Sequence, residues 1–312
     1  VYPDYASNMK QSMLAQAVDG KHYAVPAAGY WENLFVNKSV LEACGIPVPG
    51  ADYTWEQFLA DCETIKGRGY IPIACSLVEV PHYLFEFAVM NNGTVENHLE
   101  VPTLDENGNL RDDEVSRKWV AALNDIKALY DLGYFPPNTL TATDEETVSL
   151  FGNGKAAFLV DGSWQVGHLG ERFGDKIENM AVRFVPGKGE RKATEGIGGI
   201  SMGYFITRKA WKNPEKRDAA VRFVEMLTSN EILSTFIRTE VTALIDGASP
   251  VGLNSLEQSA AETNAQLTRV SLAVQDAISA EAKSTLFTSI QKVVTGQMTA
   301  EKAVATAIQR NE

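Results

Sequence analysis

The fold is decided by an early stretch that reads Asp19-Gly20-Lys21-His22-Tyr23-Ala24-Val25-Pro26 and is followed by Asn37-Lys38. A glycine turn ahead of strand-favouring residues predicts a hairpin that enters a strand. The distance from Pro26 to Asn37 predicts that the chain then crosses the molecule before its next element. Farther on, Thr54-Trp55-Glu56-Gln57-Phe58 predicts the start of a helix, because Thr54 and Gln57 have the spacing of a capping box.

Helix and strand signals alternate in the segment that follows. Residues 39–44 predict a short helix that Gly45 stops, and the capped helix runs from Thr54 to about residue 66. Residues 70–74 are the next strand candidate. The order of helix, glycine stop and strand is typical of an α/β protein.

Later segments continue this pattern. The block Phe151-Gly152-Asn153-Gly154-Lys155-Ala156-Ala157-Phe158-Leu159-Val160-Asp161-Gly162-Ser163-Trp164 predicts a glycine turn, a short apolar strand and an aromatic residue on a loop. Residues 105–109 predict a turn. Apolar spacing predicts helices at residues 83–91, 115–132, 219–227, 233–239, 264–294 and 300–309.

The composition is that of a soluble globular protein: of 312 residues, 45% are hydrophobic and 22% are charged. The formal charge of −12 argues against nucleic acid and anionic membranes as partners, because both would repel the chain. A neutral or cationic ligand fits this charge better. No apolar run approaches the ~18 residues of a membrane span. The start of the chain lacks the pattern of a signal peptide, so we expect any export signal or lipid anchor to have been removed.

Motifs for cofactors and catalysis are absent or incomplete. Cys44, Cys62 and Cys75 are too unevenly spaced for a disulfide framework or a zinc site, so we expect buried or free thiols. The run Gly199-Ile200-Ser201-Met202-Gly203 fits the nucleophile-elbow pattern, but all four histidines precede Ser201, and the elbow needs its histidine later. No phosphate-binding or dinucleotide-binding glycine motif is present. We therefore expect no cofactor and no metal.

Together, the early stretch and the block at residues 151–164 resemble the extracellular solute-binding proteins of family 1, the maltose-binding-protein-like proteins that deliver sugars to ABC importers. The resemblance runs from about Asp19 to the end of the chain. It implies an α/β fold of the type II periplasmic-binding-protein kind, with two lobes joined by a hinge. Similar proteins carry βα units ahead of the position where this chain begins, so we expect the first lobe to be incomplete.

The resemblance also implies how the chain is divided. The crossings between lobes would lie after Pro26, near residues 196–199 and near residues 247–250. Residues 1–30 and 198–248 would form the remainder of the N-terminal lobe, and residues 31–197 and 249–312 the C-terminal lobe.

Trp164 is the leading candidate for ligand contact. A sugar ring has apolar faces that lie flat on aromatic rings, and hydroxyl edges that need hydrogen-bond partners. Trp164 follows an apolar strand and matches the position at which similar proteins place a stacking tryptophan. The alternative is packing in the interior, and the exposure of the indole separates the two.

The first crossing supplies further candidates. Tyr30, Trp31 and Glu32 lie where the similar proteins line the cleft, and they would offer aromatic faces and a hydroxyl acceptor. Trp31 could instead fill the hinge region.

Two more positions complete the predicted site. His82 and Tyr83 stand at a helix entry that faces the ligand in similar proteins, although a lone histidine more often satisfies a local hydrogen bond. Gly198 and Gly199 would let the backbone approach a hydroxyl closely, or would serve only as a flexible hinge.

These residues predict the substrate-binding component of an ABC importer, which holds a mono- or oligosaccharide between its lobes and performs no chemistry. We expect permease subunits as partners, a monomeric state, and a place outside the cell, either lipid-anchored at the membrane or in the periplasm. Two alternatives stay open. The same fold could bind a non-sugar solute such as a polyamine or an organophosphate, or a glycosidase could hide its two carboxylates among the 40 acidic residues.

Overall fold

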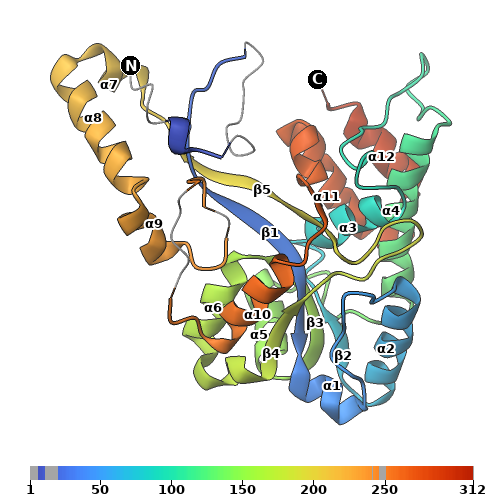
Figure 1. Cartoon of the computed structure of the whole chain (residues 1–312). Helices are drawn as coiled ribbons and strands as arrows, with labels where there is room; N and C mark the ends of the chain where they lie inside the picture. Colours follow the sequence, from blue (N-terminus) through green and yellow to red (C-terminus); the bar gives the residue numbers. More distant parts are fainter. Residues whose placement is uncertain (1–5, 11–19, 241, 246–250, 312) are drawn as a thin grey trace.

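The computed structural model describes residues 6–10, 20–240, 242–245 and 251–311, apart from the side chains at positions 201 and 236. It is an α/β protein, as predicted, built on a six-stranded sheet of order β2-β3-β1-β5-β6, with β4 paired to β1 outside this path. The strands are β1 (Val25–Asn37), β2 (Ile71–Ala74), β3 (Ala156–Gly162), β4 (Met180–Arg183), β5 (Glu195–Tyr204) and β6 (Arg269–Ser271). Helices surround this sheet (Figure 1).

The helices account for most of the remaining described residues. They are α1 (Lys38–Cys44), α2 (Trp55–Gly67), α3 (His82–Asn91), α4 (Glu114–Asp131), α5 (Asp144–Gly152), α6 (Trp164–Phe173), α7 (Arg208–Lys212), α8 (Pro214–Leu227), α9 (Asn230–Phe236), α10 (Ser255–Asn264), α11 (Ala280–Val294) and α12 (Ala300–Ile308). Short 3₁₀ segments within the described residues are η1 (Ala6–Asn8), η3 (Gly174–Asn179) and η4 (Val274–Ala277).

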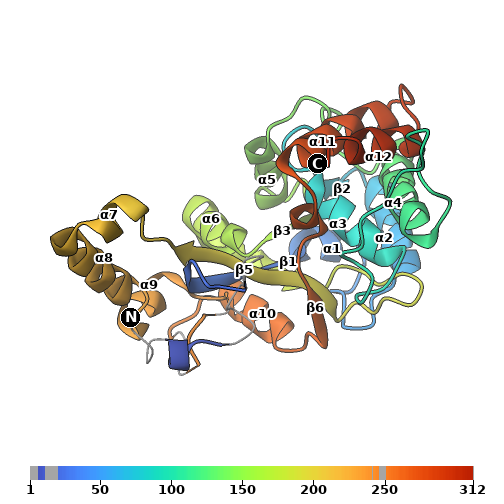
Figure 2. The same cartoon turned by 90° about the horizontal axis from the view of Figure 1, so that it is seen from above.

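The long strand β1 is the crossing that the early stretch predicts. Its first half pairs antiparallel with β5, and its second half pairs antiparallel with β3 and β4 on its two edges. Glu32 lies at the junction, because it is opposite Gly162 of β3 and Ile197 of β5. In Figures 1 and 2, β1 and β5 connect the part that carries α7–α9 with the larger part that carries the other helices.

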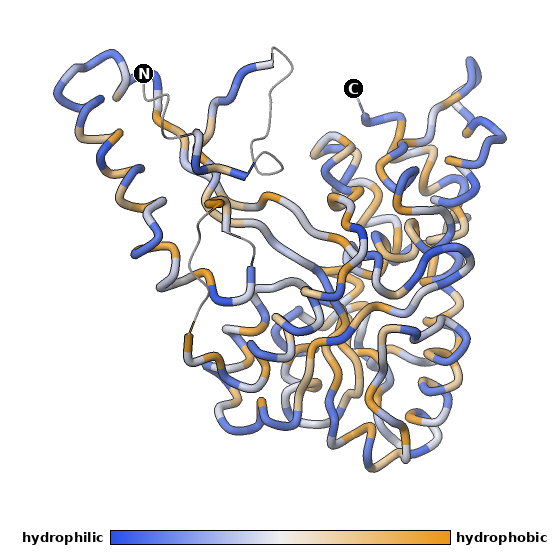
Figure 3. Tube along the Cα trace, in the orientation of Figure 1, coloured by the Kyte–Doolittle hydropathy of each residue, from blue (hydrophilic) through white to orange (hydrophobic). Residues whose placement is uncertain are grey.

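Alternate residues of the central strands serve two separate cores, because successive side chains of a strand point to opposite faces. Leu34 and Val36 of β1 join the cluster beneath α2, α3, α4, α11 and α12. Trp31 and Phe35 join the second cluster, which packs beneath α5, α6 and α10. Figure 3 shows the hydrophobic positions concentrated along the strands between these helix layers.

A third, smaller cluster lies at the other end of β1. It joins Ala27 and Ala28 of the strand to Leu233 of α9 and to Leu244. This cluster contains parts of the segments expected in the N-terminal lobe. The division into lobes stays a prediction, and the crossing expected near residues 247–250 lies outside the described residues.

Local capping signals were confirmed in detail. The Thr54 hydroxyl accepts a hydrogen bond from the Gln57 N–H, and the Gln57 side chain accepts one from the Thr54 N–H, so the capping box begins α2. Gly45 ends α1 with a φ of 73°, a conformation in which other residues are strained. The three cysteines are buried and free.

Other predictions were wrong. The helix expected over residues 264–294 is instead the end of α10, the strand β6, the segment η4 and the helix α11. The hairpin expected ahead of β1 does not form within residues 20–24, which contain no strand, and residue 19 lies outside the described residues. Trp164 does not lie on a loop, because it is the first residue of α6.

Candidate functional site

Trp164 presents an aromatic surface at the start of α6. It follows β3 after a single intervening residue, and 38% of it is exposed. Tyr83, in the first turn of α3, lies beside it with ring centroids 5.9 Å apart and an interplanar angle of 42°. Gly162 makes room for the indole, because a Cβ at that position would lie 2.1 Å from the Trp164 ring. Two elements distant in sequence thus build one aromatic surface.

A buried carboxyl group lies under this surface. Asp161, the penultimate residue of β3, is 1% exposed and accepts hydrogen bonds from the Gly162 N–H at 2.6 Å and from Gln165 Nε2 at 2.8 Å. Burial raises the pKa of Asp161 to about 7, and the nearby Asp144 carboxylate acts in the same direction. Asp161 is therefore partly protonated near neutral pH and can both donate and accept hydrogen bonds.

Two more buried carboxyl groups, those of Glu32 and Glu86, form a pair. They are 2% and 0% exposed, and no donor among the described residues reaches Glu32 Oε2 or either oxygen of Glu86. Burial raises the pKa of Glu32 to about 8 and that of Glu86 well above its usual range, and the charge of Glu32 raises the latter further. Both carboxyl groups therefore hold their protons at neutral pH, and losing these protons at higher pH would leave two like charges buried side by side.

The two aromatic residues of the crossing have different surroundings. Tyr30 is 9% exposed, and its hydroxyl oxygen accepts a hydrogen bond from the Ala273 N–H at 3.0 Å. Trp31 is 3% exposed, stacks on Phe35, and donates from Nε1 to the Thr239 carbonyl at 3.1 Å. Trp31 thus packs in the interior in this conformation, which corresponds to the hinge-filling alternative.

His82 lies against other rings. Its imidazole stacks on Phe287 with centroids 5.3 Å apart and contacts Tyr83 at 4.0 Å. Burial lowers the pKa of His82 to about 4, so the ring is neutral at pH 7. Its Nδ1 has no hydrogen-bond partner among the described residues.

Gly198 and Gly199 lie within β5, directly opposite Trp31 and Tyr30. A Cβ at Gly198 would lie 2.7 Å from the Tyr30 carbonyl oxygen, and a Cβ at Gly199 would lie 2.1 Å from a Leu272 methyl carbon. Gly198 is needed for the close approach of β5 to the β1 backbone, whereas at Gly199 only the exposed Leu272 side chain would have to move. Their contact with a ligand stays a prediction.

The structure brings together four of the eight predicted residues, Trp164, Tyr83, His82 and Glu32, and adds others. Tyr83 lies beside Trp164, His82 lies against Tyr83, and the buried Glu32 carboxyl group lies close enough to Tyr83 to affect its pKa. Sequence reasoning missed Glu86 and Gln165. Glu86 carried a usable signal, since it is a lone charged residue in an otherwise apolar helix, and such residues are rarely buried without a partner.

Among the described residues, no group of three or more His, Cys, Asp or Glu side chains could hold a metal ion. Within the same part of the chain, no helix is long and apolar enough to cross a membrane.

Comparison with known proteins places this geometry in context. The model of the family described as bacterial extracellular solute-binding protein matches residues 1–267. A search of curated proteins found no match. A solved chitin oligosaccharide binding protein is 21% identical, with a TM-score of 0.76 over 99% of this chain and 77% of that one.

Two other solved structures give the same picture. One, from a study of xylan utilization by Caldanaerobius polysaccharolyticus, is 17% identical with a TM-score of 0.79 over 99% of this chain and 78% of that one. Another, RafE in complex with raffinose, is 19% identical with a TM-score of 0.73 over 99% of this chain and 77% of that one. At these identities the likeness shows the fold, which is the predicted periplasmic-binding-protein kind.

Proposed function

This chain belongs to the family of bacterial extracellular solute-binding proteins, and from that premise we propose that it captures a mono- or oligosaccharide outside the cell for an ABC importer. The ligand would lie on Trp164 between the predicted lobes and leave unchanged. Permease subunits would be its partners, and the protein would act as a monomer, lipid-anchored or in the periplasm. The solved structures that share its fold include proteins described with chitin oligosaccharide and raffinose.

The exposed indole of Trp164 carries this proposal. It is one of the two exposed tryptophans among the described residues, it lies beside Tyr83, and it lies next to a buried polar group, Asp161. An aromatic face next to hydrogen-bonding groups matches the two sides of a sugar ring. Asp161, Glu32 and Glu86, three carboxyl groups near the aromatic surface, are almost fully buried, which supports binding without hydrolysis by these groups.

The test replaces Trp164 and measures saccharide affinity. Trp164→Ala should weaken binding by at least about tenfold, because covering an aromatic side chain contributes about 1.5–3 kcal/mol. Titration calorimetry with xylo-, chito- and raffinose-type saccharides is the measurement. Trp211→Ala is the matched control, because Trp211 of α7 is 39% exposed and lies outside the site. Equal affinities in the wild type and both variants would contradict the proposal.

The carboxyl groups near Tyr83 favour a second candidate, a polyamine ligand, since amines pair with carboxylates. The two candidates differ in their pH dependence. Because the pKa values of Asp161 and Glu32 are raised to about 7 and about 8, polyamine affinity should rise steeply between pH 6 and pH 8. Affinity for a neutral saccharide should change much less. Titrations of spermidine and a saccharide at both pH values separate them.

A further inference from the structure

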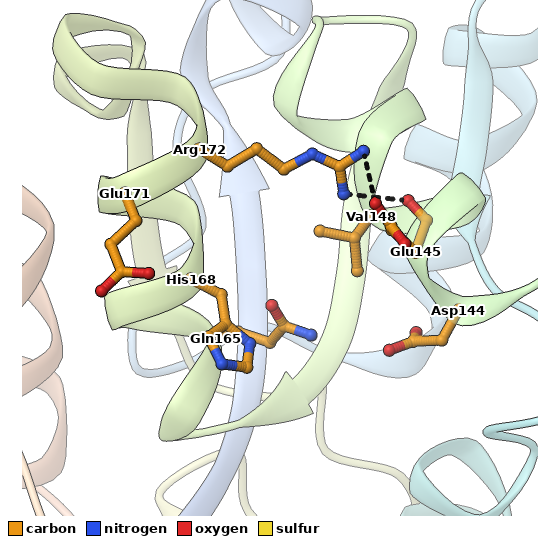
Figure 4. A pocket seen from close by; sticks show the side chains of 7 residues that line it. All are labelled: Asp144, Glu145, Val148, Gln165, His168, Glu171 and Arg172. Atoms are coloured by element: carbon orange, nitrogen blue, oxygen red, sulfur yellow. Dashed lines mark hydrogen bonds and ion pairs between the residues drawn. The ribbon is translucent and has the colours of Figure 1, made fainter.

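A pocket of about 420 Å³ lies between α5 and α6, next to the Trp164 surface. Its lining comprises Asp144, Glu145, Val148, Gln165, His168, Glu171 and Arg172. Figure 4 shows that Gln165 and His168 project from α6 toward the gap, with Asp144 and Val148 on the facing helix. Gln165 links the pocket to the aromatic surface, because its Nε2 donates at 2.8 Å to Asp161, the carboxyl group next to Trp164. Its volume falls in the range of about 300–1,000 Å³ that is common for ligand pockets.

Gln165 is an acceptor without a donor in this pocket. Its side chain is only 3% exposed, and its Nε2 donates to Asp161. Its Oε1 has no partner among the described residues. A buried polar atom left unpaired costs about 1–3 kcal/mol. A ligand that donates a hydrogen bond to Gln165 Oε1 would recover this energy.

Asp144 supplies a second acceptor of the same kind. Its Oδ1 is buried and unpaired among the described residues, and burial raises its pKa. The Asp144 backbone N–H is already used, since it donates to Glu79 Oε2 at 2.7 Å. At this end of α5, Asp144 can therefore offer its carboxyl group to a ligand, but not its backbone N–H.

The remaining walls define what could enter. Val148, which is 4% exposed, supplies an apolar wall. The Arg172 guanidinium pairs with Glu145 at 3.3 Å, so the ion pair closes one side of the pocket and neutralises the charge of Arg172. Two acceptors of the pocket, Gln165 Oε1 and Asp144 Oδ1, remain unpaired, so a matching ligand must bring hydrogen-bond donors. Anions would be repelled by Asp144 and Glu171.

We infer that this pocket is a further subsite for a sugar unit of a neutral oligosaccharide, whose hydroxyl groups donate to Gln165 Oε1 and Asp144 Oδ1 while a neighbouring unit lies on Trp164. The inference deepens the proposed function and rests on it. It assigns the ligand class as oligosaccharides that extend beyond the aromatic surface.

The test compares short and long saccharides in variants that fill or strip the pocket. The probes are xylo- and chito-oligosaccharides of two to six units, titrated calorimetrically. His168→Trp places an indole in the pocket from an exposed position, and Asp144→Ala removes one acceptor. Both should weaken the best long saccharide by about tenfold and change a two-unit ligand by less than twofold. Asp175→Trp, at an exposed position of η3 outside the pocket, should leave both unchanged.

The outcomes separate this inference from the proposed function. If long and short saccharides bind the wild type equally, or if His168→Trp weakens both to the same degree, the subsite is wrong and the Trp164 proposal stands. If no saccharide binds the wild type, the proposed function fails and the subsite with it. Thermal unfolding of each variant shows whether a lost affinity reflects a lost fold.

Discussion

At the scale of single residues, the candidate site depends on the positions of one glycine and a few buried carboxyl groups. Gly162 leaves room for the indole of Trp164, and Asp161 beside it holds Gln165 in place. The exposure of Trp164 followed from its place after an apolar strand. The burial of Trp31 could not be predicted from the sequence. Both faces of β1 are covered, so apolar and polar residues do not alternate along the strand in a way that would show which side chains point inward.

The Glu32 and Glu86 pair predicts a pH-dependent stability. The pKa of Glu32 is raised from 4.5 to about 8 and that of Glu86 is also raised, so the native state holds protons that the unfolded chain releases above about pH 4.5. Stability falls with rising pH wherever the native state binds more protons. The free energy of unfolding should therefore be greatest near pH 4.5 and decline as the pH rises through 8.

Glu86→Gln tests this explanation, since an amide keeps the size of the side chain and cannot release a proton. The variant should lose the part of the decline that Glu86 contributes and gain about 1 kcal/mol or more at pH 8, because one pKa unit corresponds to about 1.36 kcal/mol. Urea unfolding at several pH values is the measurement. Glu42→Gln, on the exposed side of α1, is the control and should follow the wild type. A steep decline retained by Glu86→Gln would refute the role of the pair.

At the scale of elements, the molecule is organised by β1, which pairs with three strands. Helix starts were predictable wherever the signal was local, as at Thr54. The short strand β6 was not, because its assignment depends on parallel pairing with β5 across about 70 residues of chain. Periodicity alone therefore extended a helix through residues 264–294.

The pairing of β1 with β5 depends on Gly198. Gly198→Ala should destabilise the protein by about 1–3 kcal/mol, because the new Cβ would meet the Tyr30 carbonyl oxygen at 2.7 Å and backbone cannot easily move. Thermal unfolding measures this effect. Gly67→Ala is the matched control, since nothing lies within 4 Å of its Cβ position in α2, and it should be neutral or slightly stabilising. Equal unfolding temperatures for the two variants would rule out the close approach.

At the scale of the whole molecule, three apolar clusters are arranged along one sheet, and the smallest lies apart at the end of β1. The α/β class and the family were predictable from two sequence blocks. The subsite between α5 and α6 was not, because it arises from side chains that meet only after both helices pack.

If the two predicted lobes close on a ligand, the radius of gyration should fall when a saccharide binds. Small-angle X-ray scattering with and without saturating oligosaccharide is the measurement. Trp164→Ala, at a saccharide concentration that calorimetry shows to be below its weaker Kd, should retain the larger radius. A radius unchanged by ligand in the wild type, under conditions where calorimetry shows binding, would contradict the two-lobe division.

The continuity of β1 also constrains how this protein can be engineered. Splitting the chain anywhere within Val25–Asn37 would divide a strand that belongs to all three clusters, so neither fragment would keep its interior. The turn at residues 105–109 offers a better place: Gly108 has a φ of 78°, and the loop lies between a single bridge of Leu104 and Leu110. A fluorescent domain inserted there should be tolerated, which would let the protein be followed by fluorescence without breaking its interior.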